Sequence, residues 1–230
     1  MTDLVIFDFD GTMFDTRAAI EHAAALTFST LLPSYEIPRD KARRLMASGV
    51  GLSETFRALH PDETFDEDTW VATYRQLYTT HEGKFTKPFP GLQEVLEGLK
   101  ARGIPIAIVS NKVVPAIRTT LERMNLSGYF HETLIIGDRT PGSEKKPDPT
   151  SYTEVLVPRF KRVHGDGVAL DPAKVLMVGD TIADLEYARN IGAKVCWCRF
   201  GQGDREECGS FQPDYTVDSL SEVLDIVAKQ

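Results

Sequence analysis

The sequence predicts an α/β protein in which helices surround a parallel β-sheet and a helical segment is inserted near the start of the chain. From residue 86 onward, short apolar runs alternate with stretches of helical periodicity, which is the pattern of βαβ units. Residues 16–85 instead show helical periodicity throughout. Ahead of both regions, residues 4–7 are four apolar residues followed closely by Asp and Gly, as expected for a strand buried on both faces.

The inserted region is expected to be a small helical bundle. Its helical stretches cover residues 17–32, 39–47, 52–59 and 67–85. Proline and glycine, which favour turns over helix interiors, interrupt these stretches at Pro33, Pro38, Gly49, Gly51 and Pro61. We therefore expect a helical cap domain over residues 16–85, placed between the first strand and the rest of the sheet.

The second half of the chain is expected to supply the remaining strands and their connecting helices. Short apolar runs predict strands at residues 104–109, 132–136, 175–178 and 194–198. Helical periodicity predicts helices at residues 91–101, 114–124, 150–162, 182–190 and 219–228. Pro105 fits the beginning of a strand, and Gly192 fits the end of a helix. Residues 1–15 and 86–230 are therefore expected to form the sheet-containing core domain.

Composition and charge restrict the class of protein. The 230 residues are 42% hydrophobic, and 26 basic against 34 acidic residues give a net charge of -8. Such a balance argues against nucleic acid or an anionic membrane as the main partner. The first residues carry no secretory signal, and no apolar run approaches the length of a membrane span. We expect a cytoplasmic protein that acts as a monomer or a homodimer on a small molecule.

The three cysteines are Cys196, Cys198 and Cys208, too few and too odd in number for a disulfide framework. Cys196 and Cys198 alternate along an expected strand and share one face, but no histidine lies close to them in sequence. A metal role for this pair is therefore not expected.

Polar residues follow four of the expected strands. Asp8 and Asp10 stand at the end of the first strand, and ligands of open α/β sheets bind at the carboxyl ends of the strands. The other strand ends carry Ser110-Asn111-Lys112, Lys145-Lys146-Pro147, and Gly179-Asp180-Thr181 with Asp184. Carboxylates gathered with a cation and a hydroxyl group suit Mg²⁺ and phosphate, because a hard cation takes oxygen ligands and neutralises phosphoryl charge.

Asp8 and Asp10 can divide the chemistry of phosphoryl transfer between them. An aspartate is ionised at neutral pH and can attack phosphorus without a separate base, so Asp8 is the predicted nucleophile. Asp10, close to another carboxylate, is the predicted acid that protonates the leaving oxygen and the base that activates water.

Each remaining residue also has an ordinary structural interpretation. Ser110 or Asn111 could simply cap the next helix, and Lys146 could be one surface lysine among many. Asp180 and Asp184 have the i, i+4 spacing at which like charges repel, a cost that is easier to understand beside a cation or hydrogen-bond donors.

The four segments resemble, in their order along the chain, the motifs of the haloacid dehalogenase (HAD) superfamily. Asp8-Phe-Asp-Gly-Thr12 is similar to motif one, Val109-Ser110-Asn111 to motif two, Lys146-Pro147-Asp148-Pro149 to motif three and Gly179-Asp180-Thr181-Ile-Ala-Asp184 to motif four. Ser48-Gly-Val-Gly-Leu52 and Phe200-Gly-Gln-Gly203 resemble the phosphoglycolate phosphatase-like branch. The resemblance implies a Rossmann-like core with a mobile helical cap at residues 16–85.

The resemblance also implies roles for individual residues. Mg²⁺ would be held by the Asp8 carboxylate, the Asp10 carbonyl and Asp180, with Asp184 behind them. Phosphate would contact Thr12, Ser110 and the Asn111 N–H, and Lys146 would bridge phosphate and Asp8. The implied activity is that of a Mg²⁺-dependent phosphatase acting on a small phosphomonoester, similar to phosphoglycolate, through an aspartyl-phosphate.

Two other functions remain open. A β-phosphoglucomutase-like mutase would return the phosphate to a second hydroxyl, and a phospho-ligand sensor would bind without turnover. The cap would select the leaving group. Gly49 and Gly51 are expected to form a substrate-facing loop, although a plain interhelical loop fits them equally. Basic cap residues that could meet a second anionic group of the substrate are Arg17, Arg43, Arg44 and Arg57.

Overall fold

A single parallel sheet forms the centre of the computed structural model, which describes residues 1–47, 51–62, 64–165 and 167–229. Its six strands lie in the order β5-β4-β1-β6-β7-β8, and every neighbouring pair is parallel. Their bounds are β1 Leu4–Phe7, β4 Ile106–Val113, β5 Ile135–Asp138, β6 Val175–Gly179, β7 Lys194–Cys198 and β8 Tyr215–Val217. The predicted α/β fold with a parallel sheet is confirmed.

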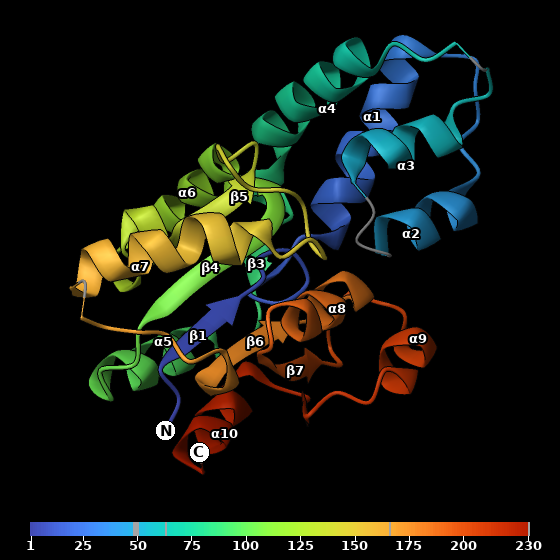
Figure 1. Cartoon of the computed structure of the whole chain (residues 1–230). Helices are drawn as coiled ribbons and strands as arrows, with labels where there is room; N and C mark the ends of the chain where they lie inside the picture. The colour runs from blue at the N-terminus through green and yellow to red at the C-terminus, as the bar shows by residue number, and fades with distance from the viewer. Residues whose placement is uncertain (48–50, 63, 166, 230) are drawn as a thin grey trace.

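Helices cover both faces of this sheet (Figure 1). Side chains alternate along β1, so Val5 and Phe7 enter one apolar cluster while Leu4 and Ile6 enter a second. The first cluster includes side chains of α5 (Leu92–Ala101), α6 (Val114–Arg123) and α10 (Val223–Ala228). The second includes side chains of α7 (Val157–His164), α8 (Ile182–Asn190) and α9 (Arg205–Ser210). The central strands are thus buried on both sides, as their continuous apolar runs predict.

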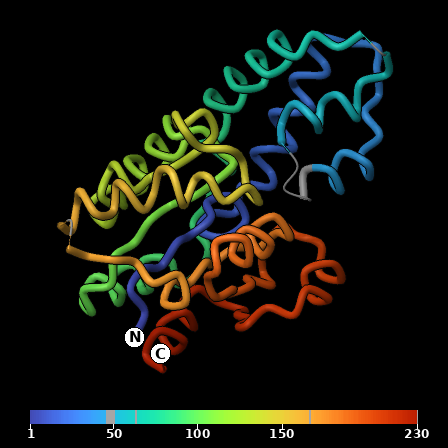
Figure 2. The backbone as a smooth tube through the Cα atoms, in the orientation of Figure 1, coloured from blue at the N-terminus to red at the C-terminus, as the bar shows by residue number. Residues whose placement is uncertain are grey.

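The helical segment forms its own apolar cluster. It contains α1 (Arg17–Leu31), α2 (Arg39–Ala47), α3 (Leu52–Leu59) and α4 (Glu67–His81), followed by a 3-10 turn at Glu82–Lys84. Aromatic rings fill its centre, and the rings of Phe28 and Trp70 lie 4.7 Å apart between centroids. The chain enters and leaves this segment through two short strands, β2 (Phe14–Asp15) and β3 (Lys87–Pro88), which pair antiparallel. Figure 2 shows the segment on the side toward which the arrow of β1 points in Figure 1.

Several boundaries differ from the sequence prediction for local reasons. The strand expected at residues 132–136 begins only at Ile135, because residues 132–134 form a 3-10 turn in which the Thr133 N–H donates to His131 Nδ1. The helix expected at residues 150–162 is a π-helix over Ser151–Leu156 followed by α7. Pro158 has no N–H to donate and fits the first turn of α7. Strand β8 was not predicted, since three residues are too few to show alternation.

Strand β4 differs in a way that matters for the site. It runs through Ser110 and Asn111 to Val113, with a register shift against β5 between Val109 and Val113. Helix α6 begins after Val113, so neither Ser110 nor Asn111 caps it. Both residues stand at the irregular end of a strand instead, beside the end of β1. Within the described residues, no helix combines the length and the apolar character that crossing a membrane requires.

Candidate active site

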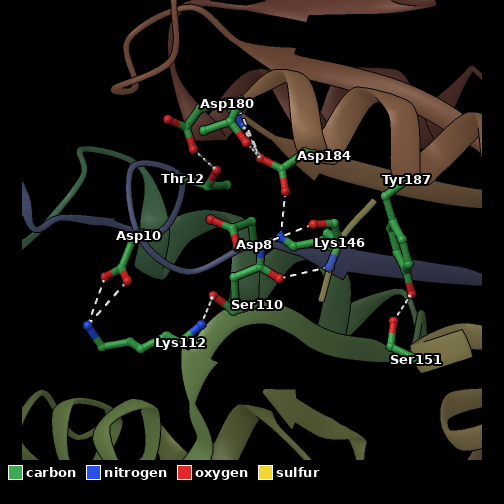
Figure 3. A network of polar contacts seen from close by, with 12 residues as sticks. Asp8, Asp10, Thr12, Ser110, Lys112, Lys146, Ser151, Asp180, Asp184 and Tyr187 are labelled. Carbon is green, nitrogen blue, oxygen red and sulfur yellow. Dashed lines mark hydrogen bonds and ion pairs between the residues drawn. The ribbon is translucent and has the colours of Figure 1, made fainter. Parts of the chain in front are cut away.

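The order of the strands places the predicted acidic residues side by side. Strand β1 lies between β4 and β6, and the Asp8 N–H donates to the Val178 carbonyl at 2.9 Å. Asp8 follows β1 and Asp180 follows β6, so both carboxylates leave the sheet at the same edge. Ser110, near the end of β4, stands on the other side of Asp8. Figure 3 shows these side chains around one centre.

Lys146 lies at the middle of this group and is buried. Its ammonium donates to Asp8 Oδ1 at 2.6 Å and to Asp184 Oδ1 at 2.5 Å. The side-chain amide of Asn111 fixes its backbone, because the Lys146 N–H donates to Asn111 Oδ1 at 2.8 Å and Asn111 Nδ2 donates to the Lys146 carbonyl at 3.2 Å. Lys146 is therefore a buried cation bound to two carboxylates, and Asn111 positions it.

Asp184 stabilises the start of α8 as well as Lys146. Its Oδ2 accepts hydrogen bonds from the Asp180 N–H at 3.1 Å, the Thr181 N–H at 2.9 Å and the Thr181 hydroxyl at 2.8 Å. Thr181 and Asp184 together form a capping box at the N-terminus of α8. These donors and Lys146 offset the repulsion expected from the i, i+4 spacing of Asp180 and Asp184.

Asp180 is fully buried and surrounded by donors. The Thr12 hydroxyl, which the family resemblance assigns to phosphate, donates to Asp180 Oδ1 at 2.8 Å in the structure. Asp180 Oδ2 accepts from the Gln202 N–H at 2.6 Å and the Gly203 N–H at 3.2 Å. The contact with Gln202 and Gly203 was not predicted, since 22 residues separate Gln202 from Asp180 in sequence.

The carboxylates of Asp8, Asp180 and Asp184 fit a divalent cation. One oxygen from each lies within 4.8 Å of the others, and all three residues are buried. Burial raises the pKa of Asp8 to about 7, against the opposing effect of Lys146, and burial followed by the charges of Asp184 and Asp8 raises the pKa of Asp180 well above its usual range. Lys146 alone does not balance three carboxylates, and oxygen donors are the ligands that hard divalent cations take.

Asp10 points away from this group and pairs with Lys112 (Figure 3). Lys112 Nζ lies 3.1 Å and 3.2 Å from the two carboxylate oxygens of Asp10 and 2.7 Å from the Tyr78 hydroxyl on α4. It also stacks over the Tyr78 ring, 4.1 Å from the centroid. Burial alone would lower the pKa of Lys112, but the contacts with Asp10 and Tyr78 have a larger, opposite effect. The pKa of Lys112 is therefore raised above its usual value, and the ammonium stays charged.

A cavity of about 430 Å³ lies between the helical segment and the strand ends. Asp8, Asp10, Ser110 and Lys146 line it from the sheet, and residues of α3 and α4 line it from the opposite side. Gly51, expected in a substrate loop, lines it at the N-terminus of α3 with φ -60°, a value that any residue adopts. Gly49 lies outside the described residues.

The basic residues of this cavity are not the expected arginines. Arg43 pairs with Glu21 and Arg57 with Glu67 at exposed positions, and the Arg17 guanidinium donates to the Gly201 carbonyl at 3.4 Å. Among the described residues, the basic side chains that line the cavity are Arg75, Lys112, Arg139, Lys145 and Lys146. Lys112 could be found from its place after Ser110-Asn111, whereas Arg75 has no distinguishing sequence signal.

The cysteines are free and buried. Cys208 Sγ lies 3.5 Å from the Asp180 carbonyl, and burial raises the pKa of its thiol to about 12. The pKa of Cys196 and that of Cys198 are raised by burial as well. All three are therefore protonated at neutral pH and act as apolar packing groups.

Comparison with known proteins gives matches over most of the chain. A family model described as haloacid dehalogenase-like hydrolase matches residues 5–198. The phosphoglycolate phosphatase of Aquifex aeolicus is 32% identical over 226 residues, which are 97% of this chain and 96% of that protein. Pyrophosphatase PpaX of Halalkalibacterium halodurans is 27% identical, over 97% of this chain and 95% of that protein. A haloacid dehalogenase-like hydrolase of Streptococcus pneumoniae shares the fold, with a TM-score of 0.79 at 23% identity and 98% coverage of both chains.

Proposed function

This chain belongs to the family of haloacid dehalogenase-like hydrolases, and we propose that it hydrolyses a small phosphomonoester with the help of Mg²⁺, through an aspartyl-phosphate on Asp8. The observation that carries the proposal is the buried cluster of the Asp8, Asp180 and Asp184 carboxylates, in which Lys146 is bound to Asp8 and Asp184. Asp8, Asp184 and Lys146 line the cavity. Relatives named phosphoglycolate phosphatase and pyrophosphatase support phosphate chemistry in this arrangement.

Asp8 is the proposed nucleophile. Its carboxylate opens to the cavity, and the hydrogen bond from Lys146 holds it in one orientation. Mg²⁺, held by Asp8, Asp180 and the Asp10 carbonyl, would supply positive charge that keeps these buried carboxylates ionised and offsets the charge of the phosphoryl group. Lys146, bound to both Asp8 and Asp184, keeps its charge and lies where it can also donate to a phosphoryl oxygen.

Ser110, Asn111 and Thr12 are the proposed phosphate contacts. The Ser110 hydroxyl lines the cavity beside Asp8 and accepts a hydrogen bond from the Lys112 N–H at 3.3 Å, which leaves its own proton to donate. The Asn111 side chain is bonded to the Lys146 backbone, and we assign the backbone N–H of Asn111 to phosphate. Thr12 could reach phosphate only by leaving Asp180.

Asp10 is the proposed acid and base. It lines the cavity two residues after Asp8, on the side that faces the helical segment, where the leaving group must lie. A carboxyl group in that position can protonate the leaving oxygen and later take a proton from water. Lys112, which holds both oxygens of Asp10, orients it toward this side.

The substrate proposed here is small and carries a second negative charge, as phosphoglycolate does. Lys112 is a buried ammonium directly beside Asp10, on the leaving-group side of the site. A carboxylate or second phosphate of the substrate would find a charged donor there. The names of the relatives are consistent with this, because phosphoglycolate and pyrophosphate both carry a second anionic group next to the bond that is cleaved.

We propose that residues 16–85 act as a cap domain over a catalytic core of residues 1–15 and 86–230. The cap side of the cavity includes Gly51 and Tyr78, and the latter contacts Lys112. Closure of such a cap would exclude water before the attack on phosphorus. Gly51, at the start of α3, remains a proposed substrate-facing position.

The direct test is phosphate release from 2-phosphoglycolate, pyrophosphate and p-nitrophenyl phosphate, with Mg²⁺ and with EDTA. We expect Mg²⁺-dependent release that EDTA abolishes. A phospho-ligand sensor would release no phosphate from any substrate. Conversion of a hexose 1-phosphate without net phosphate release would instead identify a β-phosphoglucomutase-like mutase.

A further inference from the structure

The segment Gly201–Gly203 is shaped to fit Asp180. The N–H groups of Gln202 and Gly203 both donate to Asp180 Oδ2, at 2.6 Å and 3.2 Å. A Cβ atom at Gly201 would lie 2.2 Å from Asp180 Cβ, and one at Gly203 would lie 2.1 Å from the Asp180 carbonyl oxygen. No side chain fits at either distance, so the two glycines let the backbone wrap closely around Asp180.

The same three residues contact the beginning of the helical segment on their other side. Gln202 Nε2 donates to the Thr16 hydroxyl at 3.2 Å, and both residues are buried. Thr16 immediately precedes α1 and follows β2, one of the two strands that connect the helical segment to the sheet. The Arg17 guanidinium adds a longer contact to the Gly201 carbonyl, at 3.4 Å. Gln202 thus joins Asp180, through its backbone, to the start of α1, through its side chain.

We infer that Gln202 is a positioning residue that couples the affinity for Mg²⁺ to the placement of the start of α1. The inference rests on the proposed function, in which Asp180 is a metal ligand. A shift of Thr16 would move Gln202 through their hydrogen bond, and the shift would reach the two N–H groups that orient Asp180. Because such coupling is reciprocal, a bound metal ion that fixes Asp180 also favours the observed position of α1.

The test measures Mg²⁺ binding to chelator-treated protein by isothermal titration calorimetry, without substrate. Gln202→Ala keeps the backbone N–H but loses the bond to Thr16, and Thr16→Val loses the hydroxyl at nearly constant shape. We expect each variant to bind Mg²⁺ about 3- to 10-fold more weakly, the range for loss of one hydrogen bond. The double variant should be no weaker than either single one, and Thr16→Ser should restore wild-type affinity.

Two controls separate this inference from its premise. Gln93→Ala removes an exposed glutamine side chain on α5 that donates to Glu97 at 2.8 Å, and it should leave Mg²⁺ affinity unchanged. Asp180→Asn should weaken Mg²⁺ binding more than either test variant; if it does not, the metal assignment in the proposed function fails, and the coupling fails with it. The coupling alone is overturned if Asp180→Asn weakens Mg²⁺ binding but Gln202→Ala and Thr16→Val do not. It is also overturned if the double variant loses as much affinity as the two single variants together. Should Gln202→Ala not fold, Thr16→Val and Thr16→Ser decide the question.

Discussion

Lys112 holds both carboxylate oxygens of Asp10, at 3.1 Å and 3.2 Å, and its ammonium lies against the face of the Tyr78 ring. The pair lies at the boundary between the strand ends and the helical segment, on the leaving-group side of the proposed nucleophile. A buried ammonium in this position fixes the orientation of Asp10, and we propose that it also contributes to the choice of substrate.

Lys112→Met should reduce the preference for anionic leaving groups. We expect kcat/KM for 2-phosphoglycolate to fall at least about tenfold more than kcat/KM for p-nitrophenyl phosphate, because only the former offers an anionic partner to the lost ammonium. Steady-state kinetics with both substrates measure the ratio. Lys145→Met is the matched control, since Lys145 lines the same cavity but pairs with exposed Glu54 at 3.7 Å. Equal losses on both substrates would remove Lys112 from substrate selection.

The metal-free protein should lose stability as pH rises, through Asp8. The pKa of this carboxyl in the folded protein is raised from 3.8 to about 7, chiefly by burial, so the folded state binds its proton more tightly than the unfolded state does. The associated stability is present at low pH and is lost as pH rises through about 7. In EDTA, the melting temperature of Asp8→Asn should therefore exceed that of the wild type by a margin that grows from about pH 4 to about pH 7 and then levels off. A margin that stays constant would show that Asp8 does not titrate in this way.

Loss of the Asp180 carboxylate should mainly change the Mg²⁺ requirement, whereas loss of the Asp184 carboxylate should mainly change thermal stability. Asp180→Ala should raise the Mg²⁺ concentration for half-maximal activity about tenfold or more, and by more than Asp184→Ala does. Asp184→Ala should instead lower the melting temperature in EDTA by about 2–4 °C or more, because α8 loses its capping box and buried Lys146 loses one of two carboxylates. Activity titrations and thermal melts of both variants test this. The reverse assignment of effects would contradict the roles given to the two residues.

The sequence was most informative for functional residues that directly follow a buried strand along the chain. Asp8 and Asp180 could be placed because each directly follows a buried apolar strand. Contacts made across the fold were not accessible in the same way. The bond from Thr12 to Asp180 spans 168 residues, and the one from Gln202 to Thr16 spans 186.

Packing between the helical segment and the sheet was the least predictable part. Arg75, on α4, lines the cavity and pairs at 3.0 Å with Asp138 at the end of β5. Nothing in the surrounding sequence distinguishes it from Arg57, which pairs with exposed Glu67. Periodicity identified which segments are helices, but the faces they present to the sheet depend on long-range contacts.

The central claim, that Asp8 is the nucleophile, is tested most directly by trapping its phosphorylated form. Asp10→Asn should still be phosphorylated but should lose the water step, so acid quenching after addition of Mg²⁺ and p-nitrophenyl phosphate should leave phosphate on the enzyme. Peptide mass spectrometry should locate that phosphate on Asp8, and the Asp8→Asn, Asp10→Asn double variant should carry none. Phosphate on a different residue, or the same phosphate in the double variant, would contradict the account.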